Sequence, residues 1–196
     1  MDSPLFLTRL LADAPPTVRP VAPAAGDLVC VECGLTGGDR EDFRWLSSGR
    51  GSASDGAGEV VCRLCVLGWT AAWESARVRL ALIPDWEQGL LNAVVTLLTV
   101  HRLRRRAGEP VPAGIDTVLQ SKLLNELQQR AQATAIALPY TASAATLRQT
   151  LLALPARERE PVRAELSALR YLPEERDPEL ARFFNRRRRF SSSGLV

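Results

Sequence analysis

The sequence predicts a mainly α-helical protein in which an N-terminal cysteine-containing module with short β segments precedes a helical bundle. Three observations predict this fold class. Four cysteines form two pairs in the first third of the chain, Cys30 with Cys33 and Cys62 with Cys65. Apolar residues recur at helical spacing through most of the chain after residue 85. Prolines and glycines interrupt that pattern, as expected for helices joined by short loops.

Each cysteine pair has the spacing C-x-x-C, at which one turn of backbone directs two thiolates at one metal ion. Together Cys30, Cys33, Cys62 and Cys65, which are the only cysteines, supply the four tetrahedral ligands of a closed zinc site. Four thiolates leave no open coordination position, so we expect one structural Zn²⁺ and no zinc-dependent catalysis.

Two other cysteine chemistries are alternatives to zinc binding. Two disulfide bonds would need an oxidising compartment, and Asp2 argues against the basic start of a secretory leader. A thioredoxin-like redox site needs only one C-x-x-C pair on a βαβ frame, and the sequence pattern contains no such frame.

The predicted zinc module, a zinc-ribbon or knuckle, covers residues 30–84. Its long stretch between the pairs is rich in glycine and serine and can loop out without moving the knuckles. Gly34 and Gly68 follow the two pairs, and we expect them to let backbone amides turn toward the thiolates. Phe43 and Trp45 are expected to cover the site, with contact to a partner as the alternative.

Before the module, residues 1–29 predict an extended arm because prolines break any helix there. Within the module, residues 78–84 alternate in polarity and predict a strand that ends at Pro84. Trp69 and Trp73 are four residues apart and would share one face of a short helix. Core packing and a docking patch that includes Trp86 are the two interpretations of these tryptophans.

Residues 85–173 predict a helical bundle. Its first helix has Asp85 as N-cap, is apolar nearly all round, and should therefore lie buried at the centre of the fold. It ends in arginines followed by Gly108 and Pro110, a typical stop signal. Further helices are predicted at residues 116–137, 143–154 and 161–172.

Residues 174–196 predict an arginine-rich C-terminal tail. A short helix starts near Asp177 in this tail and carries Leu180, Phe183 and Phe184, and four consecutive arginines follow it. We expect the last residues, 191–196, to be disordered.

The composition excludes several kinds of function. The formal net charge is only +3, and His101 is the only histidine, which excludes a multi-histidine metal site. No phosphate-binding G-x-x-x-x-G-K-[ST] loop is present. The longest uncharged apolar run, residues 90–100, is about half of a membrane span. We therefore expect no enzyme and no direct membrane insertion.

Four stretches of the sequence resemble a known family. They are the two cysteine pairs with their neighbours (residues 30–34 and 61–65), residues 80–92, and residues 163–173. In order and spacing they are similar to the IcmJ/DotN proteins of Dot/Icm-type (type IVB) secretion and related conjugation systems. Some members carry an HNH-like pattern with histidines between the knuckles, and this sequence has none there. The glycine- and serine-rich insertion and the arginine-rich tail are further departures.

The resemblance implies a cytoplasmic, zinc-binding, non-enzymatic subunit. Such a subunit docks on the coupling ATPase and its adaptor proteins, and is associated with the inner membrane through that partner. For this chain it implies a scaffold or adaptor of a bacterial secretion or conjugation coupling complex. Its docking surface would lie around Trp69, Trp73 and Trp86 and would hold an extended or helical segment of the ATPase.

A nucleic-acid-binding zinc-ribbon protein is the alternative function. Two arginine clusters would then contact phosphates, and affinity would fall steeply with salt. The clusters consist of Arg102, Arg104, Arg105 and Arg106 and of Arg186, Arg187, Arg188 and Arg189. Aromatic residues accompany only the second cluster, and no basic stripe follows a helix.

Overall fold

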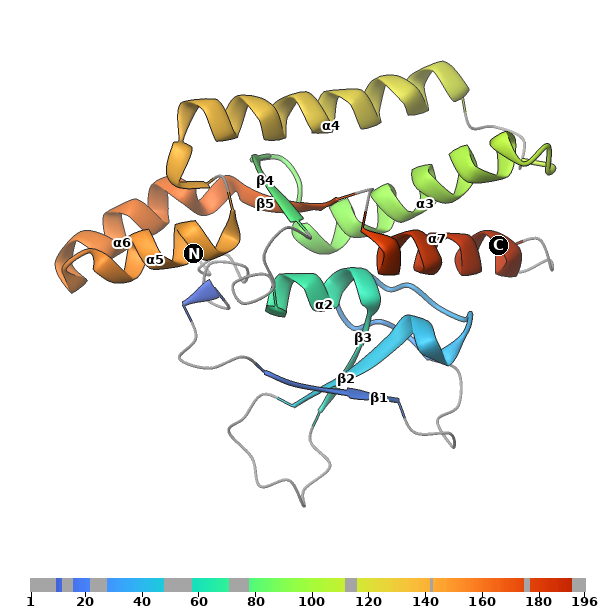
Figure 1. Cartoon of the computed structure of the whole chain (residues 1–196), viewed down its shortest axis with the longest axis horizontal. Coiled ribbons are helices and arrows are strands. Elements are labelled where there is room, and N and C mark those ends of the chain that lie inside the picture. The colour runs from blue at the N-terminus through green and yellow to red at the C-terminus, as the bar shows by residue number, and fades with distance from the viewer. Residues whose placement is uncertain are drawn as a thin grey trace. The chain divides into compact units, whose positions relative to one another are not determined.

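The computed structural model describes residues 10–11, 16–21, 28–47, 58–70, 78–111, 116–141, 143–174 and 177–191. The strands are β1 (Thr17–Pro20), β2 (Phe43–Ser47), β3 (Glu59–Cys62), β4 (Val78–Leu82) and β5 (Leu169–Pro173). The helices are α2 (Arg63–Thr70), α3 (Gln88–Arg106), α4 (Thr117–Ala137), α5 (Ala144–Ala153), α6 (Ala156–Glu165) and α7 (Pro178–Ser191) (Figure 1). Short 3-10 turns lie at Arg40–Asp42, Pro139–Thr141 and Leu166–Ala168. The predicted fold class is confirmed, because four clustered cysteines lie among short N-terminal strands and helices follow.

The chain folds into two compact units, each made of separate stretches. The cysteine unit comprises Pro16–Val66, Gly89–Leu124 and Glu175–Val196. The helical unit comprises Met1–Pro15, Leu67–Gln88 and Asn125–Glu174. Each unit therefore combines residues from several of the four consecutive segments predicted from the sequence, which are residues 1–29, 30–84, 85–173 and 174–196. Among the described residues, no helix combines the length and the apolar character needed to cross a membrane.

The cysteine unit contains a three-stranded antiparallel sheet in the order β1-β2-β3. Thr17 of β1 lies opposite Ser47 of β2, so part of the predicted arm is an edge strand of this sheet. Phe43 of β2 lies opposite Cys62 of β3, which places the second cysteine pair at the end of the sheet. The core of the unit is apolar and includes Phe43, Leu46, Val61, Leu64, Leu91, Val95, Leu180, Phe183 and Phe184.

Helix α3 is buried on one face only. Leu90 and Leu97 are 56% and 49% exposed, whereas the polar side chains of Asn92, Thr96 and Thr99 are buried. The expectation of a helix buried all round at the centre of the fold is therefore wrong. Its polar residues can face inward because their groups find partners, as when the Thr96 hydroxyl donates to the Asn92 carbonyl at 2.8 Å.

The predicted start of α3 is wrong, and its predicted end is confirmed. The helix begins at Gln88 rather than just after Asp85. It ends at Arg106 as predicted, and Gly108 beyond it has a φ of 69°. There the N–H groups of Gly108 and Glu109 donate to the carbonyls of Arg105 and Arg104, the bonding pattern of a glycine-terminated helix.

The helical unit is organised around the antiparallel pair β4 and β5. Val78 lies opposite Pro173 and Leu82 opposite Leu169, which confirms the predicted strand at residues 78–84. The helix predicted at residues 161–172 is wrong. Helix α6 instead ends at Glu165, with Pro161 inside it, and the chain continues into β5.

The side chain of Gln88 forms hydrogen bonds with the backbone of β5. Its Nε2 donates to the Tyr171 carbonyl and its Oε1 accepts from the Tyr171 N–H, both at 2.9 Å. Beside it, Nε of Arg170 donates to the Trp86 carbonyl at 2.6 Å. Two of the stretches that carry the family resemblance are therefore bonded to each other within this unit.

Gly68 has a packing role and does not turn the backbone toward a thiolate. It lies within α2, and a Cβ atom added to it would stand 2.6 Å from Cε1 of Tyr171, which is fully buried. The expectation of a knuckle glycine at this position is therefore wrong. Only a residue without a side chain leaves room for the tyrosine ring here.

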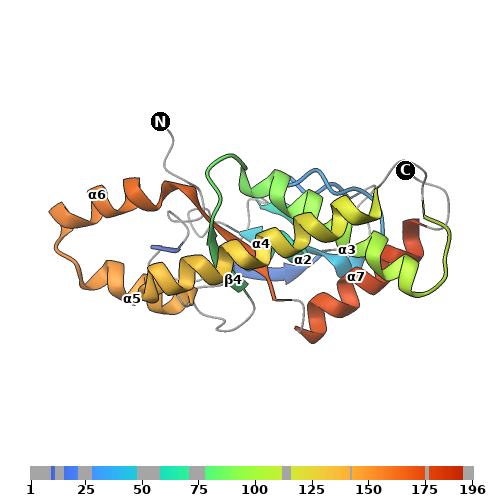
Figure 2. The same ribbon diagram turned by 90° about the horizontal axis from the view of Figure 1, so that it is seen from above.

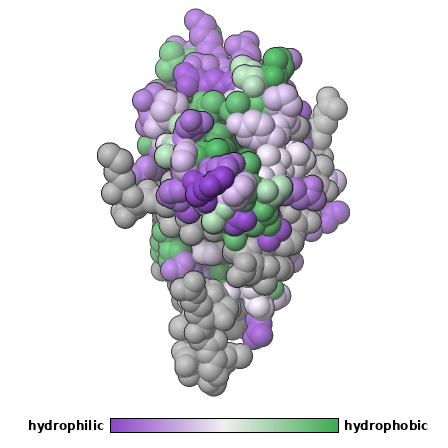
Figure 3. Space-filling model, turned by 90° about the vertical axis from the view of Figure 1, so that its left-hand side faces the viewer, coloured by the Kyte–Doolittle hydropathy of each residue, from purple (hydrophilic) through white to green (hydrophobic). Residues whose placement is uncertain are grey.

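The helices predicted at residues 116–137 and 143–154 are confirmed as α4 and α5 (Figure 2), and each begins with a side-chain cap. Oδ1 of Asp116 accepts from the Val118 N–H at 2.7 Å at the start of α4. The Ser143 hydroxyl accepts from the Thr146 N–H at 3.0 Å at the start of α5. None of the described residues of α6 is buried. Hydrophilic and apolar side chains are intermixed on the face of the molecule that Figure 3 shows.

Candidate metal centre

The first cysteine pair lies in a tight loop of the cysteine unit. Val29 and Thr36 form a β-bridge across its base, and the Cys30 N–H donates to the Leu35 carbonyl at 2.9 Å. The Gly34 N–H donates to the Cys30 carbonyl at 2.9 Å, and Gly34 has a φ of 70°. A glycine is favoured here because the left-handed backbone lets the loop close directly after Cys33.

The second pair lies at the junction of a strand and a helix. Cys62 is the last residue of β3, and Cys65 belongs to the first turn of α2. The Cys62 N–H donates to Sγ of Cys30 at 3.2 Å, so one pair already bonds to the other. Phe43 is fully buried opposite Cys62, whereas Trp45 is partly exposed.

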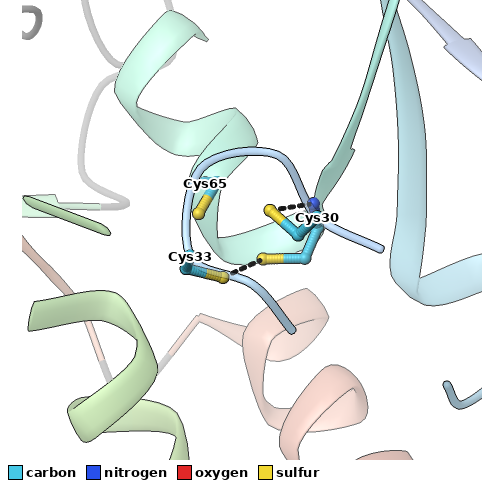
Figure 4. Close-up of side chains that lie close together, drawn as sticks. Cys30, Cys33 and Cys65 are labelled. Atoms are coloured by element: carbon cyan, nitrogen blue, oxygen red, sulfur yellow. Dashed lines mark hydrogen bonds between the residues drawn. The ribbon is translucent and has the colours of Figure 1, made fainter. Parts of the chain in front are cut away.

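The four sulfur atoms converge on one point. All four Sγ atoms lie within 4.8 Å of one another, and those of Cys33 and Cys62 are 3.7 Å apart (Figure 4). A tetrahedral metal with metal–sulfur bonds of about 2.3 Å separates its sulfur ligands by about 3.8 Å. A disulfide bond would require about 2 Å, and all four cysteines are free. The arrangement is consistent with one metal ion.

Charge at the cluster also favours a cation. Hydrogen bonds from the other three thiols, that of Cys33 first, lower the pKa of Cys30. The neighbouring Cys30 and Cys33 sulfurs raise the pKa values of Cys62 and Cys65, and burial adds to the effect. A divalent ion would take the place of the thiol protons when it binds.

Asn92 is a site residue that sequence reasoning missed. It lies on α3, is 1% exposed, and its Nδ2 donates to Sγ of Cys65 at 3.2 Å. Its signal in the sequence is weak, because a single asparagine in an apolar helix is read as a residue of the polar face. Here the sulfur accepts its hydrogen bond, which lets a polar side chain point into the core.

Asn92→Leu is expected to weaken zinc binding by about 10- to 100-fold, the usual loss when a group that supports a metal ligand is removed. The reason is that Cys65 would lose its side-chain hydrogen-bond donor while the ligand set stays intact. The measurement is competition for Zn²⁺ with a coloured chelator. Thr96→Val is the matched control, because its hydroxyl lies one turn further on and bonds to a carbonyl. Equal affinity of Asn92→Leu and wild type would contradict the assignment.

Several arginines of the two predicted clusters form ion pairs or hydrogen bonds within the cysteine unit. Arg104 is buried, and its Nε lies 3.8 Å from Oε2 of Glu109. Nε of Arg188 lies 3.7 Å from Oε1 of the same glutamate. Arg186 and Arg187 bind groups in residues 36–42. Arg105 and Arg106 are exposed.

The other residues considered in the sequence analysis are the three tryptophans of the predicted docking surface and His101. Trp69 and Trp86 are both partly exposed and belong to the helical unit. Trp73 lies outside the described residues, as do residues 192–196 of the tail. His101 is buried, and burial together with the charge of Arg104 lowers its pKa. It does not join the group of metal-ligating side chains found among the described residues.

Comparison with known proteins assigns no family. No family model matches the sequence, and no curated protein matches it. The cluster of four thiols is therefore the strongest functional feature of the described chain.

Proposed function

We propose that the four cysteines bind one structural Zn²⁺. The observation that carries this proposal is the convergence of four Sγ atoms within 4.8 Å from a loop, a strand end and a helix start. An all-thiolate set is the soft, tetrahedral donor set that suits zinc. Because four protein ligands fill its coordination sphere, the ion would polarise no substrate and activate no water.

The bound ion would contribute to the folding of the cysteine unit. Structural zinc binds small peptides with about 10–16 kcal/mol, comparable to the whole stability of about 5–15 kcal/mol of a typical domain. Its ligands lie far apart in the sequence, and Asn92 of α3 adds a further contact to the centre. Zinc would therefore stabilise the position of α3 as well as that of the loop and sheet.

We further propose that the protein is a non-enzymatic adaptor subunit of a type IVB-like secretion or conjugation coupling complex. The resemblance of residues 30–34, 61–65, 80–92 and 163–173 supports this function. Within the fold those stretches supply internal contacts, such as Gln88 with Tyr171 and Asn92 with Cys65. The partner would be a segment of the coupling ATPase, and the protein would reach the inner membrane through it.

Binding of nucleic acid is the competing function, and the arginine contacts count against it. Arg186 and Arg187 are occupied by Asp42 and by backbone carbonyls, and Arg104 is buried. A phosphate-binding surface would need these guanidinium groups to face solvent. Of the two clusters, Arg105, Arg106 and Arg189 would be left as the exposed groups.

An affinity pull-down from the native cell, with and without nuclease treatment, distinguishes the two functions. If the adaptor function is right, mass spectrometry identifies a coupling ATPase in equal amounts in both samples. Trp86→Ala should then reduce its capture, whereas the double variant Arg105→Gln/Arg106→Gln should leave it unchanged. Partners that disappear with nuclease, and with the double arginine variant, would overturn the adaptor function in favour of nucleic-acid binding.

A further inference from the structure

The C-terminal helix α7 binds the loop that follows the first cysteine pair. Nη1 of Arg187 donates to the Gly37 carbonyl at 2.5 Å, and Nη2 donates to the Thr36 carbonyl at 2.8 Å. Thr36 also forms the β-bridge with Val29 that closes the loop carrying Cys30 and Cys33. One guanidinium group therefore holds the base of the loop that supplies two of the four sulfurs.

The loop is shaped to admit this guanidinium. Gly38 has a φ of 95°, and a Cβ atom added there would lie 2.2 Å from Nη1 of Arg187. Any other residue at position 38 would both strain the backbone and displace the arginine.

The preceding residue of the helix, Arg186, forms ion pairs with the same part of the cysteine unit. Nε of Arg186 lies 2.7 Å from Oδ1 of Asp42, a side chain with no exposed surface, and its Nη1 lies 3.3 Å from Glu41. The pair of Arg186 with Asp42 is internally neutral. Arg187 adds a second positive charge next to this pair, and Asp42 attracts it as well.

A zinc ion with four thiolates carries a net charge of −2, which is costly in a largely buried site. The N–H groups of Cys62 and Asn92 supply dipoles to the sulfurs but no net charge. Arg187 supplies a full positive charge, and attraction to Asp42, Cys62 and Cys33 partly offsets the lowering of its pKa by burial. Cys62 is buried and Arg187 is partly buried, and electrostatic attraction is stronger there than between fully exposed groups.

We propose that Arg187 is a positioning residue of the metal centre, which supplies its counter-charge and holds the loop of Cys30 and Cys33 in place. This inference rests on the proposed structural-zinc function. It couples the ends of the chain, because retention of the ion depends on a helix far from the cysteines in sequence. By linkage, a bound ion also favours the docked position of α7.

The test is the rate at which the full-length, zinc-loaded protein releases Zn²⁺ to excess chelator. Arg187→Gln and Gly38→Ala are expected to release it at least ten-fold faster, since each removes the guanidinium from its place by a different route. Arg187→Lys keeps the charge without the paired hydrogen bonds and should give an intermediate rate. Two controls should behave as wild type. Arg189→Gln removes an exposed arginine of the same helix, and Gly108→Ala strains a positive φ with no atom within 4 Å.

A spectroscopic readout separates the charge from a merely structural role. In the Co²⁺-substituted protein, the sulfur-to-cobalt absorption band of Arg187→Gln should shift, and that of Arg187→Lys should stay near the wild-type position. Release from Arg187→Gln at the wild-type rate, or an unshifted band, overturns the proposal. A wild-type protein that binds no zinc overturns the structural-zinc function first and this inference with it. Equal rates in zinc-loaded samples overturn this inference alone.

Discussion

Cys62→Ser is expected to abolish zinc binding and to unfold the cysteine unit. Cys62 is fully buried, its sulfur lies 3.7 Å from that of Cys33, and its N–H bonds to the sulfur of Cys30. Its loss would remove one of four ligands and would leave three thiols, two of them buried, without the ion that holds them together. The measurement combines zinc content, circular dichroism and limited proteolysis.

The extent of unfolding tests the composition of the unit. Helices α3 and α7 supply buried residues to the cysteine unit, so part of their helical signal should be lost together with the N-terminal strands. Wild-type protein treated with a strong zinc chelator is the control and should reach the same state. A Cys62→Ser protein that stays folded and protease-resistant would show that the metal contributes no folding energy.

Gly89→Ala is expected to destabilise the cysteine unit by about 1–3 kcal/mol, the usual cost of overpacking. Alanine is a better helix former than glycine, by at most about 1 kcal/mol, and Gly89 lies in the first turn of α3. A Cβ atom at Gly89 would lie 2.1 Å from the carbonyl oxygen of Glu32. Glu32 stands between Cys30 and Cys33, and a backbone atom cannot move aside without moving the loop. The melting temperature should fall and zinc release should become faster.

Leu90→Ala is the matched control for this glycine. Leu90 is the next residue of the same helix and is largely exposed, so its truncation should change the stability of the unit by less than about 0.5 kcal/mol, as is usual for surface sites. If Gly89→Ala instead raises the melting temperature, helix propensity outweighs the clash. The close packing of α3 against the first cysteine pair would then be wrong.

Local signals in the sequence predicted the parts of the fold that depend on nearby residues. The two C-x-x-C pairs come together, and Gly34 closes the loop after Cys33 in a left-handed conformation. Ser143 caps its helix and Gly108 ends another. In each case the bonding partners lie within a few residues, so composition and spacing determine the outcome.

The predictions that were wrong or missing concern residues whose contacts lie far away in the sequence. Residues 169–173 form a strand because β4 and Gln88 satisfy their backbone groups from about ninety residues away. Asn92 faces inward because a cysteine sulfur accepts its hydrogen bond, and Arg187 is placed by carbonyls near the other end of the chain. No local pattern encodes these contacts. The docking surface and the segment boundaries stay predictions.

The metal and thiol content of the purified protein tests the central claim most directly. The protein would be isolated without chelators, its metals would be quantified by mass spectrometry, and its thiols would be alkylated after denaturation with chelator. The account predicts one zinc ion per chain and four alkylated cysteines, with the zinc absent from Cys62→Ser. A chain without metal whose cysteines form two disulfide bonds would contradict it.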